Sequence, residues 1–128
     1  MFDRIETLRM ASSLTAHAAE RQKLIAQNVA NADTPGFRAR DLAGFAEAYR
    51  SRVSAEMRGT RPGHLTGASW GGAERAVDDG GEPAPNGNTV SLEEEMIRIA
   101  ETRRDFDVSL AVTRSAMSLI RTSLGRRG

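Results

Sequence analysis

The sequence predicts an elongated all-α protein in which long N- and C-terminal helices pair as an antiparallel, coiled-coil-like hairpin, with a short helix and an irregular Gly-rich loop between them. Three observations support this prediction. Residues 2–32 and 91–124 contain neither Pro nor Gly and are rich in helix-forming residues. Residues 59–88, in contrast, hold eight of the 12 Gly and three of the four Pro. Aromatic residues make up only 5% of the chain, which is too few for a thick globular core but normal for helices that each bury one stripe.

The 128 residues leave little room for two independent cores, so we expect one structural unit. Its expected parts are an N-terminal helix (1–32), a turn with a short helix (33–60), a Gly/Pro-rich loop (61–90) and a C-terminal heptad helix (91–125). In the first helix, apolar and small residues recur at steps of three and four, which predicts one buried stripe. The residues of this stripe are Leu8, Ala11, Thr15, Ala18, Gln22, Ile25 and Val29.

A turn is expected directly after the first helix. Pro35 cannot continue a helix and restricts Thr34 to extended geometry, so the helix should stop near Asn31. The order Thr34-Pro35-Gly36-Phe37 suits a type II turn, because Pro sets φ at the second position and Gly supplies a positive φ at the third.

The middle of the chain is less regular. Asp41 could cap a short helix that ends at Gly59 and places Leu42, Phe45, Tyr49, Val53 and Met57 on one face. Residues 59–88 show no helical period and are interpreted as a loop or a loose β-excursion. Trp70 lies in that segment without an apolar run around it, so we expect it to anchor the loop on a helix or a partner.

The last helix has the strongest pattern in the sequence. Ser91 and Glu94 have the spacing of a capping box, and Glu93, Glu94 and Glu95 lie in the first turn, where the helix dipole favours anions. A four-three alternation then runs without a break to Gly125 and predicts a packed helical seam. The residues of this seam are Leu92, Met96, Ile99, Arg103, Phe106, Leu110, Thr113, Met117, Ile120 and Leu124.

The sequence offers no constellation for catalysis, and we expect no cofactor and no metal. There is no cysteine, and His17 and His64 lack the local spacing of metal ligands; His17 is expected on a helix surface or interface and His64 in a loop contact. A formal charge of +1 does not favour nucleic acid, and the arginines of the last helix alternate with Glu101, Asp105 and Asp107, as in a solvated or inter-subunit ion-pair face. These arginines are Arg98, Arg103, Arg104, Arg114 and Arg121. No stretch reaches the roughly 20 apolar residues of a membrane span, and the charged start of the chain is unlike a secretory signal.

Two motifs carry a resemblance to a known family. Residues 28–37, Asn-Val-Ala-Asn-Ala-Asp-Thr-Pro-Gly-Phe, resemble the signature shared by flagellar rod, hook and hook-associated proteins, in which a helix of the form N-(I/V)-A-N ends in a T-P-G-(F/Y) turn. The continuation Arg38-Ala39-Arg40-Asp41 and residues 87–96, Gly-Asn-Thr-Val-Ser-Leu-Glu-Glu-Glu-Met, are similar to the proximal-rod proteins of the bacterial flagellar basal body. The resemblance spans about residues 14–60 and 86–124.

The resemblance implies a non-enzymatic subunit that is exported by the flagellar type III export apparatus without a cleaved signal peptide and polymerises into the periplasmic rod. The partners it implies are copies of the chain, other flagellar rod proteins and the junction of the rod base with the MS ring. It assigns a turn role to Asn28, Asn31, Thr34, Pro35, Gly36 and Phe37, and a helix-start role to Asn88 and Ser91 beside the capping Glu94. The expected assembly interface comprises Leu8, Ala11, Ala18, Ile25, Val29, Leu92, Met96, Ile99, Phe106, Leu110, Met117, Ile120 and Leu124.

An alternative from a different class is a cytoplasmic helical adaptor or export chaperone that binds one partner through the same heptads. The two hypotheses differ in the expected behaviour of the purified chain. An adaptor should form a stable, defined dimer or heterodimer, whereas a rod subunit should be a labile monomer that assembles only with its partners. One helical seam against one partner is energetically marginal, because about 1–2 kcal/mol of backbone entropy is lost for each ordered residue.

Overall fold

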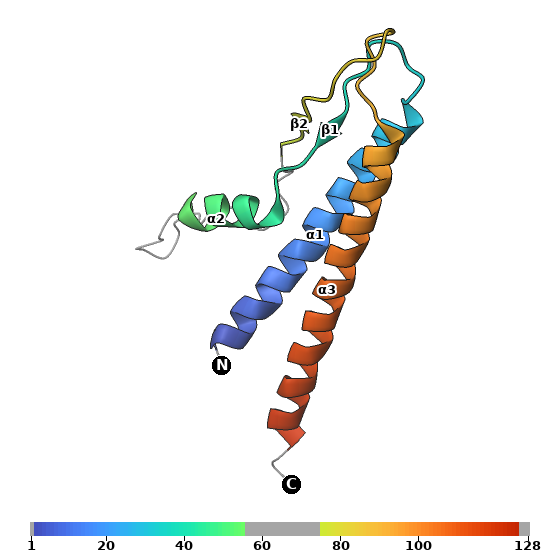
Figure 1. Cartoon of the computed structure of the whole chain (residues 1–128). Helices are drawn as coiled ribbons and strands as arrows, with labels where there is room; N and C mark the ends of the chain where they lie inside the picture. The colour runs from blue at the N-terminus through green and yellow to red at the C-terminus, as the bar shows by residue number, and fades with distance from the viewer. Residues whose placement is uncertain (1, 56–74, 126–128) are drawn as a thin grey trace.

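The computed structural model describes residues 2–55 and 75–125 and shows an elongated helical hairpin (Figure 1). Helix α1 spans Phe2–Ala30 and helix α3 spans Leu92–Gly125. The two helices lie side by side and run in opposite directions, with the connecting segments at one end of the hairpin (Figure 1). The predicted fold class is therefore confirmed. Among the described residues, none of the helices combines the length and apolarity needed to cross a membrane.

A short β-ribbon and a third helix branch from the side of the hairpin. Strand β1, Arg40–Asp41, pairs antiparallel with strand β2, Val77–Asp78, and Arg40 lies opposite Asp78. Helix α2 spans Phe45–Ala55, and the carbonyl of Gly44 accepts the N–H groups of its first turn. The prediction that Asp41 caps this helix is wrong, because Asp41 belongs to β1. The predictions for Gly59, His64 and Trp70 lie outside the described residues.

Small side chains allow α1 and α3 to approach each other closely. On α1, Ala11, Ala18 and Ile25 are buried at a spacing of seven residues. The buried residues of α3 have the same spacing, and they are Glu95, Thr102, Ser109 and Ala116. The hydroxyl of Thr15 donates a 2.9 Å hydrogen bond to that of Ser109 across the interface. The seven-residue repeat in both helices is typical of an antiparallel coiled-coil contact.

The apolar stripe predicted for the last helix does not form this contact. Leu92, Met96 and Leu124 are 54%, 69% and 71% exposed, and Ile99, Phe106 and Met117 are exposed as well, whereas Leu110 and Ile120 are half-buried. With 3.6 residues per turn, the apolar stripe lies roughly 80° around α3 from the buried line of small residues. On α1, Val29 is likewise exposed and Leu8 is half-buried. The small residues of α1 leave a narrow gap that only small side chains of α3 can fill, so the larger residues lie outside it.

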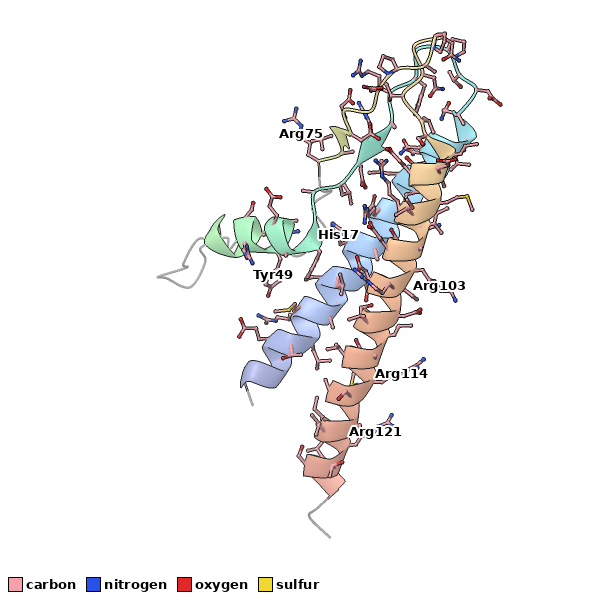
Figure 2. All side chains as sticks on the ribbon, in the orientation of Figure 1. His17, Tyr49, Arg75, Arg103, Arg114 and Arg121 are labelled. Atoms are coloured by element: carbon pink, nitrogen blue, oxygen red, sulfur yellow. The ribbon has the colours of Figure 1, made fainter. Side chains whose placement is uncertain are left out.

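Helix α2 is attached to α1 through His17. This histidine is buried, and its Nε2 lies 2.9 Å from the carbonyl oxygen of Ala43, so Nε2 carries the proton of that hydrogen bond. The His17 ring contacts Phe45 edge-on with 5.6 Å between ring centroids, and Phe45 stacks at an angle on Tyr49. Figure 2 shows His17 and Tyr49 between the two helices. His17 therefore joins two elements of this chain.

Candidate functional site

The turn at the end of α1 has the predicted conformation. The N–H of Phe37 donates to the carbonyl of Thr34 over 3.2 Å, and Gly36 has a φ of +73°, as the third position of a type II turn requires. The Asn31 amide donates to the carbonyl of Gln27, and the Thr34 hydroxyl donates to Asn31 Oδ1. The Gly36 N–H donates to the carbonyl of Asn86, which brings the turn against the segment that precedes α3.

Asn88 holds this turn in place. It is buried, and its Nδ2 lies 2.8 Å from the carbonyl oxygens of Asn31 and Ala32 and 2.9 Å from that of Thr34. These carbonyls lie at the end of α1 and beyond it, where the regular N–H partners four residues ahead in a helix are missing. Asn88 Oδ1 accepts the N–H of Val90. The structure thus places the Asn88 amide on the C-terminal end of α1, whereas the family resemblance implied a helix-start role.

Ser91 and Glu94 begin α3 much as expected. The N–H of Glu94 points to Ser91 Oγ over 3.4 Å, which is one half of a capping box. The Glu94 carboxylate lies 3.7 Å from the guanidinium of Arg98, and its side chain is 58% exposed.

Asn28 links three elements through one buried amide. Its Nδ2 donates to the carbonyl of Arg40 over 2.8 Å, and its Oδ1 accepts the N–H of Arg40 over 3.1 Å, so the amide pairs with the backbone of β1 as a neighbouring strand would. Nδ2 also donates to Oε1 of Glu95 on α3 over 3.0 Å. The first Asn of the N-V-A-N segment therefore fixes the β-ribbon and α3 to α1.

A cluster of charged side chains lies between the ribbon and the two long helices. Arg21 makes a bidentate pair with Asp41, with both N–O distances at 2.9 Å, and contacts Glu101 over 3.2 Å. Arg98 contacts Glu95 over 2.7 Å, Asp79 over 3.0 Å and Asp41 over 3.6 Å. Arg98 was expected on a solvated or inter-subunit face, but its side chain is 15% exposed and its partners belong to the same chain.

Two carboxyl groups of this cluster have shifted pKa values in opposite directions. Burial, helped by the charges of Asp41 and Asp79, raises the pKa of Glu95, which is 1% exposed, against the lowering by the Asn28 hydrogen bond and the Arg98 charge. Partial burial also acts to raise the pKa of Asp41, but the hydrogen bonds from Arg21 and the Leu42 N–H, with the charges of Arg21 and Arg98, outweigh it and lower the pKa. Glu95 Oε2 has no hydrogen-bond partner within the described part of the chain. The fold thus stabilises the charged form of Asp41, whereas it disfavours the charged form of Glu95.

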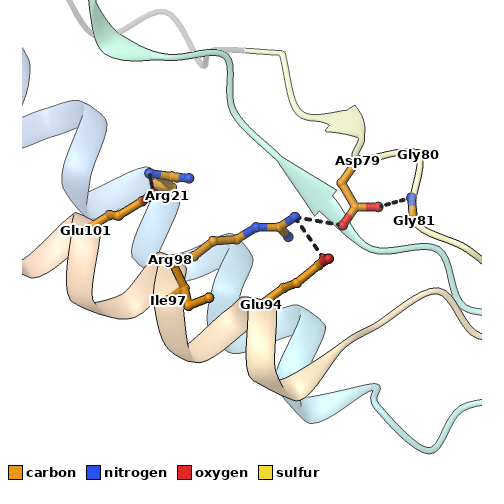
Figure 3. Close-up of a pocket in the computed structure, with 8 residues that line it drawn as sticks. All are labelled: Arg21, Asp79, Gly80, Gly81, Glu94, Ile97, Arg98 and Glu101. Atoms are coloured by element: carbon orange, nitrogen blue, oxygen red, sulfur yellow. Dashed lines mark hydrogen bonds and ion pairs between the residues drawn. The ribbon is translucent and has the colours of Figure 1, made fainter.

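The cluster borders an open pocket of about 400 Å³ (Figure 3). The pocket lies between the Gly-containing segment after β2 and the first three turns of α3, and its walls are mostly polar. The residues that line it are Arg21, Asp79, Gly80, Gly81, Glu94, Ile97, Arg98 and Glu101. Over residues 2–55 and 75–125, no three His, Cys, Asp or Glu residues are grouped so that they could hold a metal ion. The arrangement joins the ribbon to both long helices.

Several of these residues were not found from the sequence. The first-turn position of Glu95 was explained by the helix dipole alone, and Arg21, Asp41 and Asp79 were not singled out as partners. The signal that could have found Glu95 is its spacing, because Glu95, Thr102, Ser109 and Ala116 repeat every seven residues, as do Ala11, Ala18 and Ile25. The exposed apolar stripe is longer and more hydrophobic, so it obscured this second repeat.

The hairpin, the T-P-G-F turn clamped at its end and the outward-facing heptad stripe together make an elongated helical subunit with an apolar surface open to a further helix. The sequence profile of the flagella basal body rod protein family matches residues 8–38. The flagellar basal body rod protein FlgB of Agrobacterium fabrum is 35% identical over 120 residues, which cover 87% of each chain. The chain belongs to the FlgB family of flagellar basal body rod proteins, and it is a structural subunit of that rod.

Two further FlgB relatives show similarity over most of the chain. The protein of Salmonella typhimurium is 32% identical over 127 residues, which cover 91% of this chain and 92% of the relative. That of Escherichia coli is 29% identical over 123 residues, which cover 87% and 88%.

Proposed function

We propose that this chain is a subunit of the proximal rod that polymerises through the outward-facing apolar stripe of α3 and the adjoining surface of α1. The single observation that carries this proposal is the position of the stripe. A complete four-three repeat from Leu92 to Leu124 lies on a helix whose contact with α1 uses a different line of residues. A heptad seam in which six of the eight apolar residues are exposed is a surface that fits the helix of another subunit.

The energy available on this surface suits assembly. Full burial of an apolar side chain contributes about 1.5–3 kcal/mol, so the eight apolar stripe residues of α3 can supply the association energy that the small-residue contact with α1 does not use. Partners of matching geometry are copies of the chain and other flagellar rod proteins. The junction of the rod base with the MS ring and the flagellar type III export apparatus are further partners in this proposal, with the assembled chain in the periplasm.

We infer that the role is structural and not catalytic, because the family is one of rod proteins and the charge cluster serves to hold elements together. The turn network supports the same function. Asn28 and Asn88 use buried amides to fix the ribbon and the α1 terminus, so each subunit presents its stripe in one orientation. A polymer needs such uniformity, because small differences between subunits add up along it.

The experiment tests Met117→Asp in place of the natural chain in a motile strain. Met117 is 50% exposed, so the substitution should leave the helicity and thermal unfolding of the purified chain nearly unchanged. In the assembled seam, however, an unpaired carboxylate would be buried, and the variant should be absent from isolated basal bodies. Ser118→Asp is the matched control, because Ser118 is exposed one residue away and outside the stripe.

Normal incorporation of Met117→Asp would contradict the proposed interface. A stable dimer in solution, without incorporation of the natural chain into basal bodies, would contradict the rod function and would support the adaptor hypothesis.

A further inference from the structure

A second surface of α3 lies outside the apolar stripe and beside the buried line of residues that packs on α1. It includes Glu94 and Glu101, which line the open pocket at 58% and 47% side-chain exposure. Ile97, also in the pocket wall, is 61% exposed and lies between them on the same side of the helix. This surface is polar at its edges and apolar in its middle, which is the usual composition of a protein contact site.

The pocket surface carries an excess of negative charge. Arg21 and Arg98 share five carboxylates through the ion pairs described above, which are Asp41, Asp79, Glu94, Glu95 and Glu101. Glu95, Asp41 and Asp79 lie closest to the guanidinium groups, at 2.7, 2.9 and 3.0 Å, and all three are more buried than Glu94 and Glu101. Glu94 and Glu101 therefore keep negative charge at the exposed rim, where a cation from another molecule can reach them.

The opposite end of α3 carries the complementary charge. Arg114 and Arg121 are exposed and point away from α1 (Figure 2). Within the part of the chain that the structure describes, neither takes part in an ion pair. The two arginines are seven residues apart, as are Glu94 and Glu101, so each pair spans about 10 Å along the helix axis. A second copy of this chain thus offers two cations at the spacing of the two anions.

We propose that Arg114 and Arg121 of one copy dock on Glu94 and Glu101 of the next, and that this contact sets the axial register between copies. Arg114 follows Glu94 by 20 residues, and Arg121 follows Glu101 by 20 residues, so one parallel stagger of about 30 Å satisfies both pairs.

The acidic and basic surfaces lie on different faces of the subunit, which makes the contact heterologous. In a heterologous contact, each added copy uses one kind of surface and leaves the other kind free for the next copy, so the contact can propagate. This inference rests on the proposed rod function, and it adds the determinant of register, because the apolar stripe alone does not distinguish one heptad offset from another.

The test uses single charge reversals and their pairwise rescue in the natural chain context. Glu94→Arg should lower the amount of the chain in isolated basal bodies by about tenfold, because it places like charges opposite each other in every contact. Adding Arg114→Glu should restore incorporation to within about twofold of the natural level, whereas adding Arg121→Glu should not, because in a parallel stagger Arg121 faces Glu101.

The control is Glu93→Arg, which makes the same change in the first turn of α3, at an exposed position outside the pocket. It should assemble normally, and circular dichroism of each purified variant verifies that the hairpin still folds. Unimpaired incorporation of Glu94→Arg would overturn the inference, as would rescue by Arg121→Glu in place of Arg114→Glu, or rescue by neither. All three outcomes leave the natural chain in basal bodies, whereas failure of the rod function would remove the natural chain as well.

Discussion

The buried amide of Asn28 offers a sharp test of the network at the closed end of the hairpin. In Asn28→Asp, an oxygen replaces Nδ2 and meets two acceptors, the Arg40 carbonyl at 2.8 Å and Glu95 Oε1 at 3.0 Å. Two carboxylates this close do not both ionise, so the new carboxyl group at position 28 and the carboxyl group of Glu95 should retain one proton between them. That proton also restores a donor between the two side chains.

The cost of holding this proton sets the size of the effect. A carboxyl with a pKa near 4 that stays protonated at pH 7 costs about 4 kcal/mol, at about 1.4 kcal/mol per pH unit. This cost of about 4 kcal/mol is an upper limit, because burial already raises the pKa of Glu95 in the natural chain, and less free energy is then needed to keep its carboxyl group protonated. At pH 5 the same cost falls to about 1.4 kcal/mol. The folded variant binds one proton more than the unfolded chain between these pH values, so its stability must fall as the pH rises.

The assay is denaturant unfolding of the purified chain at pH 5 and pH 7, followed by far-UV circular dichroism. We expect Asn28→Asp to lose about 3–4 kcal/mol relative to the natural chain at pH 7 and to recover about 2–3 kcal/mol of this at pH 5. Asn31→Asp is the control, because the Nδ2 group of Asn31 donates only to the carbonyl of Gln27 in an exposed bond. It should cost under about 1 kcal/mol at both pH values. Equal losses for Asn28→Asp at pH 5 and pH 7 would refute the assigned geometry.

Four other changes test separate parts of the fold. Gly36→Val should lower the thermal midpoint of unfolding and reduce incorporation into basal bodies. Because φ is +73° at this position and no atom crowds it, backbone strain of about 1–2 kcal/mol is the main cost. Gly36→Asn should lose less stability, because Asn tolerates this φ. Asn88→Leu removes the amide that donates to three carbonyls and should lower the free energy of unfolding by about 2–4 kcal/mol. An unchanged denaturation midpoint would show that water fully replaces the Asn88 amide. Ser109→Leu overpacks a fully buried position in the contact of the two helices and should destabilise by about 1–3 kcal/mol, whereas Ser109→Ala should cost less. The pKa of Asp41 is lowered in the folded state, so its pair with Arg21 stabilises the fold above the ordinary carboxyl pKa. This stabilisation is lost as the pH falls through the folded-state pKa. In an acid titration, Asp41→Asn should therefore lose less stability over that range than the natural chain does.

Local sequence signals predicted the secondary structure and the turn well. Helix-forming composition without Gly or Pro determined α1 and α3, and Pro35 followed by Gly36 determined the type II turn, because both residues restrict backbone dihedrals on their own. The prediction for Asp41 was wrong for a related reason. A capping residue is a local option that competes with tertiary partners, and here pairing with Arg21 and β2 prevails over capping.

The seven-residue repeat by itself determined that α3 has a seam, and the tertiary structure decided which seam faces α1. Two repeats coexist on this helix, one apolar from Leu92 to Leu124 and one small and polar from Glu95 to Ala116. Hydrophobicity alone favours the first, but Ala11 and Ala18 allow α1 to approach only where α3 is narrow. The partners of Asn28 and Asn88 also required the fold, because the residues they contact lie up to 67 positions away in the chain. Periodicity is a property of one helix, whereas the choice of face depends on the shape of two surfaces together.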